Sequence, residues 1–176
     1  IVATIFPEYD WVRQVLGDRA GEVQLTLLLD SGTDLHSYQP TAADMLTIGE
    51  CDLFLYNGGE SDAWVERVLA TAANPDRRTL SVMEVLGDSV LEEEVVEGMQ
   101  EAEDHDHAEG EAHEEEADEH VWLSLRNART ACAEIARVLG ELDPDHAAEY
   151  QTNAENYMAE LEALDGEYAA LAENAA

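Results

Sequence analysis

Short apolar runs alternate with segments of helical period along the first half of the chain, and this alternation limits the fold more than any other feature. Runs typical of buried strands occupy residues 1–6, 23–29 and 52–56, and a shorter run covers 78–82. The segments between them repeat apolar residues at steps of three and four, as amphipathic helices do. Because strands that alternate with helices pair in parallel through right-handed crossovers, we predict an α/β fold, a parallel-sheet sandwich with helices on both faces.

A loop after the second predicted strand carries His36. Ligands of parallel sheets bind beyond the carboxyl ends of the strands, which is where this histidine lies. Thr41 is a predicted N-cap, and Asp44 completes a capping box that starts the next helix, so the loop is held at both ends. Neutral imidazole binds zinc and neighbouring metals well, and His36 is therefore a candidate metal ligand.

A second candidate ligand, His120, follows a strongly acidic tract. Residues 92–119 contain fifteen Asp and Glu residues together with His105, His107 and His113. We predict a mobile loop here, because the segment is too polar and too self-repelling to pack, and its histidines are expected to be weak auxiliary ligands. Order is expected to return at His120, where Val121-Trp122-Leu123 is apolar enough to dock on the core. Glu119 offers a possible extra carboxylate ligand, although a solvated loop carboxylate is the alternative.

The charge balance indicates which partners the chain binds. It has 41 acidic residues against 8 basic ones, a formal net charge of -33. Such a surface repels nucleic acid and anionic lipid and attracts divalent cations. No Gly-x-Ser-x-Gly elbow or His-x-x-x-His pair is present, so we predict a protein that is not an enzyme. The chain opens without a leader or a membrane span, which leaves a cytosolic protein and a processed one as alternatives.

The last third of the chain is predicted to be helical. Asp143 and Pro144 are predicted to cap the final helix. Before it we predict a helix over 126–139, whose inner face comprises Ala128, Ala131, Cys132, Ile135 and Leu139. A helix of roughly 30 residues is about 45 Å long, more than a domain of this size easily covers, so the chain is expected to be cut short. Cys51 and Cys132 are predicted to be buried, with a disulfide left open, and His146 is predicted to lie on the surface. The apolar stripe of the last helix comprises Ala147, Tyr150, Ala154, Tyr157, Leu161, Leu164, Tyr168 and Leu171.

Several of these segments together resemble a known family. They are Leu35-His36-x-Tyr38-x-Pro40-Thr41-x-x-Asp44, the strand and turn at 52–58, the acidic histidine loop, and Asp118-x-His120-x-Trp122-Leu123. The chain is similar to the metal-binding solute-binding proteins of ABC transporters (cluster A-I), in particular the zinc-specific branch. The resemblance implies two α/β lobes joined by a long helix, with the metal between them. It implies that this chain comprises the first lobe, 1–142, and the linking helix, 143–176, without the second lobe.

The resemblance also implies a function. His36 and His120 would be ligands, and the remaining ligands would come from the second lobe. The expected activity is high-affinity capture of Zn(II) outside the cytoplasm, in the periplasm or at the cell surface, for delivery to an ABC permease. The alternatives are a manganese- or iron-binding member of the same family, a zinc-dependent hydrolase, and an adhesin-like module; imidazole ligands favour Zn(II) over Mn(II). Without second-lobe cover, self-association is expected through Leu161, Leu164, Tyr168 and Leu171, more readily as salt rises, or else fraying of the helix beyond about Asp165.

Overall fold

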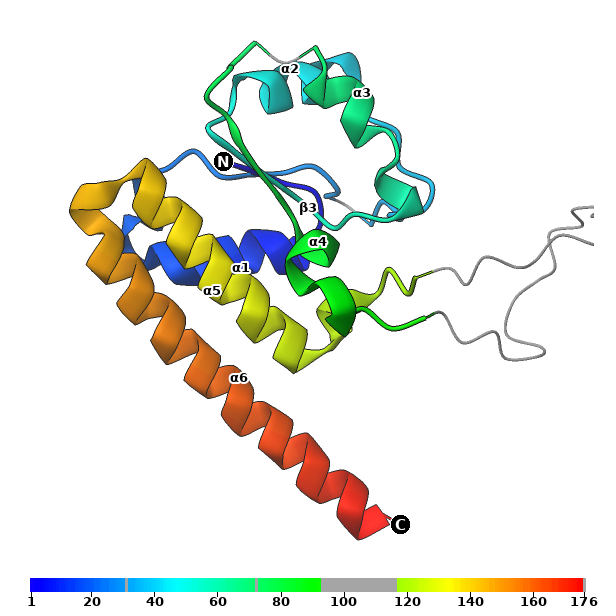
Figure 1. Ribbon diagram of the computed structural model, residues 1–176, viewed down its shortest axis with the longest axis vertical. Helices are drawn as coiled ribbons and strands as arrows, with labels where there is room; N and C mark the ends of the chain where they lie inside the picture. The colour runs from blue at the N-terminus through cyan, green and yellow to red at the C-terminus, as the bar shows by residue number, and fades with distance from the viewer. Residues whose placement is uncertain (31, 72, 93–116, 176) are drawn as a thin grey trace, which may run out of the picture.

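The structure of the protein, a computed structural model, describes residues 1–30, 32–71, 73–92 and 117–175. Its centre is a four-stranded sheet in the order β2-β1-β3-β4, and every pairing is parallel, with Val2 of β1 opposite both Thr26 and Phe54. The predicted α/β fold with a parallel sheet is therefore confirmed (Figure 1). The strands are β1 (Val2–Ala3), β2 (Thr26–Leu27), β3 (Leu53–Tyr56) and β4 (Arg78–Ser81).

Helices cover both faces of the sheet (Figure 1). Alternation along β3 produces two cores, because Leu53 and Leu55 point to one face and Phe54 to the other. On the first face lie α1 (Phe6–Leu16), α4 (Val82–Leu86), α5 (Leu125–Leu142) and part of α6 (Ala147–Ala175). On the second face lie α2 (Ala42–Glu50) and α3 (Val65–Leu69).

The first two strands are shorter than predicted. The run 1–6 was expected to be one strand, but the chain turns after Ala3 and α1 begins at Phe6. The reason is Glu8, whose Oε2 atom accepts hydrogen bonds from Thr4 and from the backbone N–H of Ile5, which starts the helix early. The ladder between β1 and β2 accordingly pairs only Val2–Ala3 with Thr26–Leu27. The short helix α4 was not predicted at all.

The helix α5 confirms its predicted inner face. Ala128, Ala131, Cys132, Ile135 and Leu139 are all buried in the first core. Both cysteines are buried and free, so they do not form the disulfide that the sequence left open. Within the described ranges, no helix is long and apolar enough to cross a membrane.

The helix α6 is covered along its first half and exposed along its second (Figure 1). Tyr150 and Ala154 are buried against α1 and α5, whereas Leu164, Tyr168 and Leu171 are exposed. The prediction that Leu161 is uncovered was wrong, because this side chain is only 8% exposed. The covered part of the stripe therefore extends from Tyr157 to its next member, Leu161, about one helical turn further than expected.

The start of this last helical region also differs from prediction. Asp143 does not cap the helix backbone with its side chain; its carboxylate instead contacts Nδ1 of His146 at 2.9 Å and accepts from the Tyr150 hydroxyl at 2.7 Å. His146 is therefore half-buried and paired, which corrects its prediction as a plain surface residue.

Candidate metal site

The loop that carries His36 is held in place by its neighbours. Asp34 Oδ1 accepts the backbone N–H of His36 at 2.8 Å, which makes a tight turn. Leu35 and Tyr38 are buried in the second core. The capping box predicted for Thr41 and Asp44 is present, and the Tyr38 hydroxyl adds a hydrogen bond of 3.0 Å to the same Asp44 carboxylate. The loop thus leaves the sheet edge with its histidine side chain 53% exposed.

The segment that carries His120 is held at its start by a short antiparallel bridge between Glu92 and Ala117, and Asp118 N–H donates to the Leu91 carbonyl at 2.8 Å. The described residues thus resume at Ala117, so this contact lies three residues before His120. Beyond it, Val121 is buried as predicted, but Leu123 is 75% exposed and does not dock on the core.

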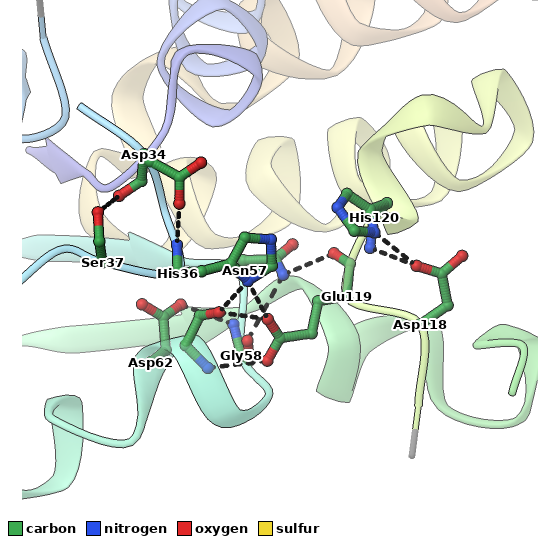
Figure 2. Close-up of polar contacts among 10 residues, drawn as sticks. Asp34, His36, Ser37, Asn57, Gly58, Asp62, Asp118, Glu119 and His120 are labelled. Atoms are coloured by element: carbon green, nitrogen blue, oxygen red, sulfur yellow. Dashed lines mark hydrogen bonds and ion pairs between the residues drawn. The ribbon is translucent and has the colours of Figure 1, made fainter. Parts of the chain in front are cut away.

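Asp118 holds His120 in two ways (Figure 2). One of its oxygens accepts the backbone N–H of His120 at 2.8 Å and lies 2.9 Å from Nδ1 of the same residue. The backbone hydrogen bond is the largest cause that lowers the pKa of Asp118, and the ring adds to it. Because a carboxylate only accepts, Nδ1 of His120 carries the proton, and Nε2 is left with its lone pair.

The fold brings the two histidines together although 84 positions separate them in the sequence. Their ring centroids are 5.5 Å apart, with the ring planes inclined by 57°. Both line one cavity of about 330 Å³, whose wall comprises Ile5, Phe6, Pro7, Leu29, Thr33, Asp34, Leu35, His36, His120 and Trp122. Nδ1 of each ring faces a protein oxygen, at 2.9 Å in both cases. Two imidazole Nε2 atoms are therefore available to a metal ion.

Glu119 lies behind His36 and is not the solvated loop carboxylate that was the alternative. Its side chain is only 12% exposed. Oε1 accepts the Ser61 backbone N–H at 2.8 Å, and Oε2 accepts the Ser61 hydroxyl and lies 3.5 Å from Nδ1 of His36. The carboxylate is thus part of the packed site (Figure 2).

Two further carboxylates lie beneath the site. Burial raises the pKa of Asp62 to about 6 and that of Glu8 to about 8. Asp62 accepts the Gly58 N–H at 2.9 Å, and Glu8 accepts from Thr4 and Ile5, but the second oxygen of each carboxylate is buried without a partner among the described residues. The prediction did not include either residue, because neither lies in a segment that looked like a ligand motif.

The other predicted ligands lie outside the described ranges. His105, His107 and His113 fall within 93–116, so the structure does not test them, nor does it test the predicted mobility of that loop. In the described part of the chain, no group of three or more His, Cys, Asp or Glu side chains is placed to hold a metal ion. The described residues therefore contribute a pair of imidazoles.

Sequence reasoning missed the loop after β3 that receives Glu119. Asn57 Nδ2 donates to the Glu119 carbonyl at 2.8 Å, and Ser61 binds the carboxylate. At the turn predicted for Asn57-Gly58-Gly59, both glycines have positive φ and the chain bends at Gly59. A different feature could have been found in the sequence. Asp34-Leu35-His36 and Asp118-Glu119-His120 repeat an Asp-x-His pattern, and in both the aspartate accepts the backbone N–H of the histidine.

Comparisons with known proteins agree with this architecture. The family model for the periplasmic component A of the zinc-uptake complex, ZnuA, matches residues 1–176. The zinc-binding lipoprotein AdcA of Streptococcus pneumoniae serotype 4 is 36% identical over 169 residues, which are 96% of this chain and 32% of AdcA. The high-affinity zinc uptake system protein ZnuA of Bacillus subtilis is 31% identical over 175 residues, 99% of this chain and 52% of that protein.

Solved structures are similar over nearly the same span. Zn(II)-bound AdcA from Streptococcus pneumoniae superposes with a TM-score of 0.71 at 28% identity, over 95% of this chain and 31% of that one. FpvC from Pseudomonas aeruginosa in complex with Mn²⁺ superposes with a TM-score of 0.69 at 28% identity, over 94% and 53%. The chain spans about a third to a half of the length of these proteins. Because the family model covers the whole sequence, the chain belongs to the ZnuA family of metal-binding solute-binding proteins.

Proposed function

We propose that this chain is the first lobe of a protein that captures Zn(II) outside the cytoplasm and delivers it to an ABC importer. His36 and His120 bind the ion through their Nε2 atoms. The observation that carries the proposal is the meeting of these two rings, 5.5 Å apart, at one cavity. Both Nδ1 atoms face protein oxygens, which leaves both Nε2 atoms for the metal.

The ligand set needs more than this chain. Zinc takes about four ligands, and two imidazoles fill half of that shell. We propose that residues 1–142 form the metal-binding lobe, that 143–176 form a linking helix, and that a second lobe completes the shell. The exposed second half of α6 supports this division, because Leu164, Tyr168 and Leu171 are an uncovered apolar face.

Zinc is proposed over manganese because imidazole ligands favour it. The relatives include proteins named for zinc, and FpvC has been solved with Mn²⁺ bound. Metal analysis after mild purification, followed by competition between Zn(II) and Mn(II), tests whether this protein prefers zinc or manganese. The family match supports uptake over the zinc-dependent hydrolase, and an esterase and phosphatase screen of the zinc-loaded protein tests that alternative.

The ligands are tested by substitution in the intact protein. His36→Ala and His120→Ala should each weaken Zn(II) binding by more than about 100-fold, since loss of a direct ligand exceeds the roughly 10- to 100-fold effect of an outer-shell residue. His146→Ala is the matched control, because this histidine contacts Asp143 instead of the cavity and its loss should leave the affinity unchanged. Isothermal calorimetry that shows unchanged affinity in the double variant His36→Ala/His120→Ala contradicts the assignment.

The histidines of the acidic tract are proposed as auxiliary ligands. Deleting all of 92–117 would also remove the Glu92–Ala117 bridge, so residues 93–116 are replaced by a short glycine linker. This change should lower the number of Zn(II) ions bound but keep the tightest site, because His36, His120 and the bridge remain. Equilibrium dialysis with a zinc indicator counts the ions. Loss of the tight site, with the fold intact by circular dichroism, would make the tract the main ligand source instead.

The proposed partners are the ABC permease and a second copy of this chain. The exposed α6 residues favour self-association, and nearby exposed carboxylates such as Glu160 and Glu167 oppose it until salt screens their charge. Light scattering of the 176-residue chain should show a mass that rises with salt. A monomer at high protein and salt concentration contradicts this expectation.

A further inference from the structure

Glu119 is the most constrained carboxylate around the two histidines. The loop after β3 binds its carbonyl through Asn57 and its carboxylate through the backbone and hydroxyl of Ser61. A Cβ atom at Gly59 would overlap the same carboxylate, so the loop has room for Glu119 only because glycine stands there. The loop after β3 therefore forms a binding site for the Glu119 side chain, which lies about 60 positions further along the sequence.

The hydrogen bonds around Ser61 have only one consistent direction. The Ser61 hydroxyl has a single hydrogen, and the Glu119 carboxylate can only accept it. The Ser61 Oγ atom, 2.9 Å from Nδ1 of His36, must then accept a hydrogen from the ring. Nδ1 of His36 therefore carries the proton, and the lone pair lies on Nε2.

We infer that Ser61 and Glu119 are positioning residues that hold His36 in the Nδ1–H tautomer and present its Nε2 atom to the metal. This inference rests on the proposed function. It assigns Glu119 a role different from the extra ligand predicted from sequence. The two ring nitrogens point in divergent directions, and Glu119 lies on the Nδ1 side, 3.5 Å from that atom, whereas a metal bound to Nε2 lies on the other side.

The closing experiment reads the tautomer directly, without metal. In the wild-type protein, ¹⁵N NMR at a pH of about 8, above the ordinary histidine pKa of about 6.5, should show His36 protonated at Nδ1. Ser61→Ala removes the acceptor and should release the ring to a mixture of tautomers. Ser61→Thr keeps the hydroxyl and should keep the wild-type tautomer.

Glu119→Gln makes the sharpest test. The Gln carbonyl must face the Ser61 backbone N–H, which turns the amide N–H₂ toward the Ser61 hydroxyl. Ser61 then donates to Nδ1 of His36, and the tautomer should invert to Nε2–H. Glu60→Gln is the matched control, because Glu60 is an exposed carboxylate of the same loop and should change nothing.

Zn(II) titration of the same variants separates the inference from the proposed function. Ser61→Ala and Glu119→Gln should weaken binding by about 10- to 100-fold, as outer-shell changes do, with Ser61→Thr close to wild type. Weakened binding with an unchanged His36 tautomer in both variants overturns the inference and makes Glu119 a ligand or a structural residue. If the wild type binds no Zn(II) while the tautomers change as expected, the proposed function fails and the positioning contacts stand. If Glu119→Gln does not fold, the comparison of Ser61→Ala with Ser61→Thr tests the inference alone.

Discussion

The two histidine segments begin alike and then differ. In each, an aspartate two positions before the histidine accepts its backbone N–H at 2.8 Å. Asp118 also reaches Nδ1 of His120, whereas Asp34 does not contact the ring of His36. His36 instead meets Ser61, 25 positions along the chain, and behind it Glu119.

The two rings are therefore oriented in different ways, His120 by a local contact and His36 by tertiary contacts. His120 is oriented by its own turn as soon as that turn forms. His36 is oriented only when the segment around Glu119 has docked on the loop after β3. Because that segment also carries His120, the same docking brings both histidines to the cavity, and disturbing it should harm both.

Gly59→Ala should have the largest effect, because it disturbs both histidines. It forces a side chain into a φ of +79° and against the Glu119 carboxylate, so both rings should lose their placement. We expect stability to fall by about 1–3 kcal/mol or more and Zn(II) affinity to fall by over about 100-fold. Urea unfolding and zinc titration measure these effects.

The control for this change is Gly87→Ala, which also has positive φ but has open space around its Cβ position. It should cost stability and leave zinc affinity unchanged. Equal loss of affinity in both variants would mean that backbone strain, and not the Glu119 contact, is responsible.

The two aspartates provide a more direct test. Asp118→Ala removes contacts to both the backbone and the ring and should weaken Zn(II) binding by about 10- to 100-fold. Asp34→Ala removes one backbone contact, worth about 1 kcal/mol, and should weaken it only several-fold. Calorimetry that gives the same loss for both would show that the histidines are oriented in the same way.

Substitution of Glu8, which lies beneath the site, should have the smallest effect on metal binding. Burial raises its pKa from 4.5 to about 8, so the folded state holds the proton more tightly than the unfolded state. Stability from this group is full below pH 4.5 and is lost as pH rises to about 8. Asp62, with its pKa raised from 3.8 to about 6, adds a second loss of stability as pH rises through this narrower range.

Glu8→Gln, which mimics the protonated acid, should flatten this loss without changing zinc affinity at neutral pH. Urea unfolding from pH 5 to 9 measures the slope. A slope as steep in the variant as in the wild type would place the pH dependence elsewhere.

Much of this architecture was predictable because it depends on local pattern. The alternation of strands and helices, the capping box at Thr41 and Asp44, and the inner face of α5 all follow from short-range spacing. The end of β1 was not predictable in this way, since it depends on Glu8 turning back onto Thr4 and Ile5. A buried carboxylate in that role does not differ in sequence from an exposed one.

Short-range patterns in the sequence are enough to predict two imidazole ligands and a parallel sheet with a loop at its carboxyl edge. Three features appear only in the folded chain: the two rings meet across 84 positions, Glu119 lies behind His36, and the apolar stripe of α6 is covered as far as Leu161. The two groups differ in the sequence distance over which their interactions act. Turns and caps are settled between residues a few positions apart, whereas the tautomer of His36 depends on a serine and a glutamate that only folding brings to it.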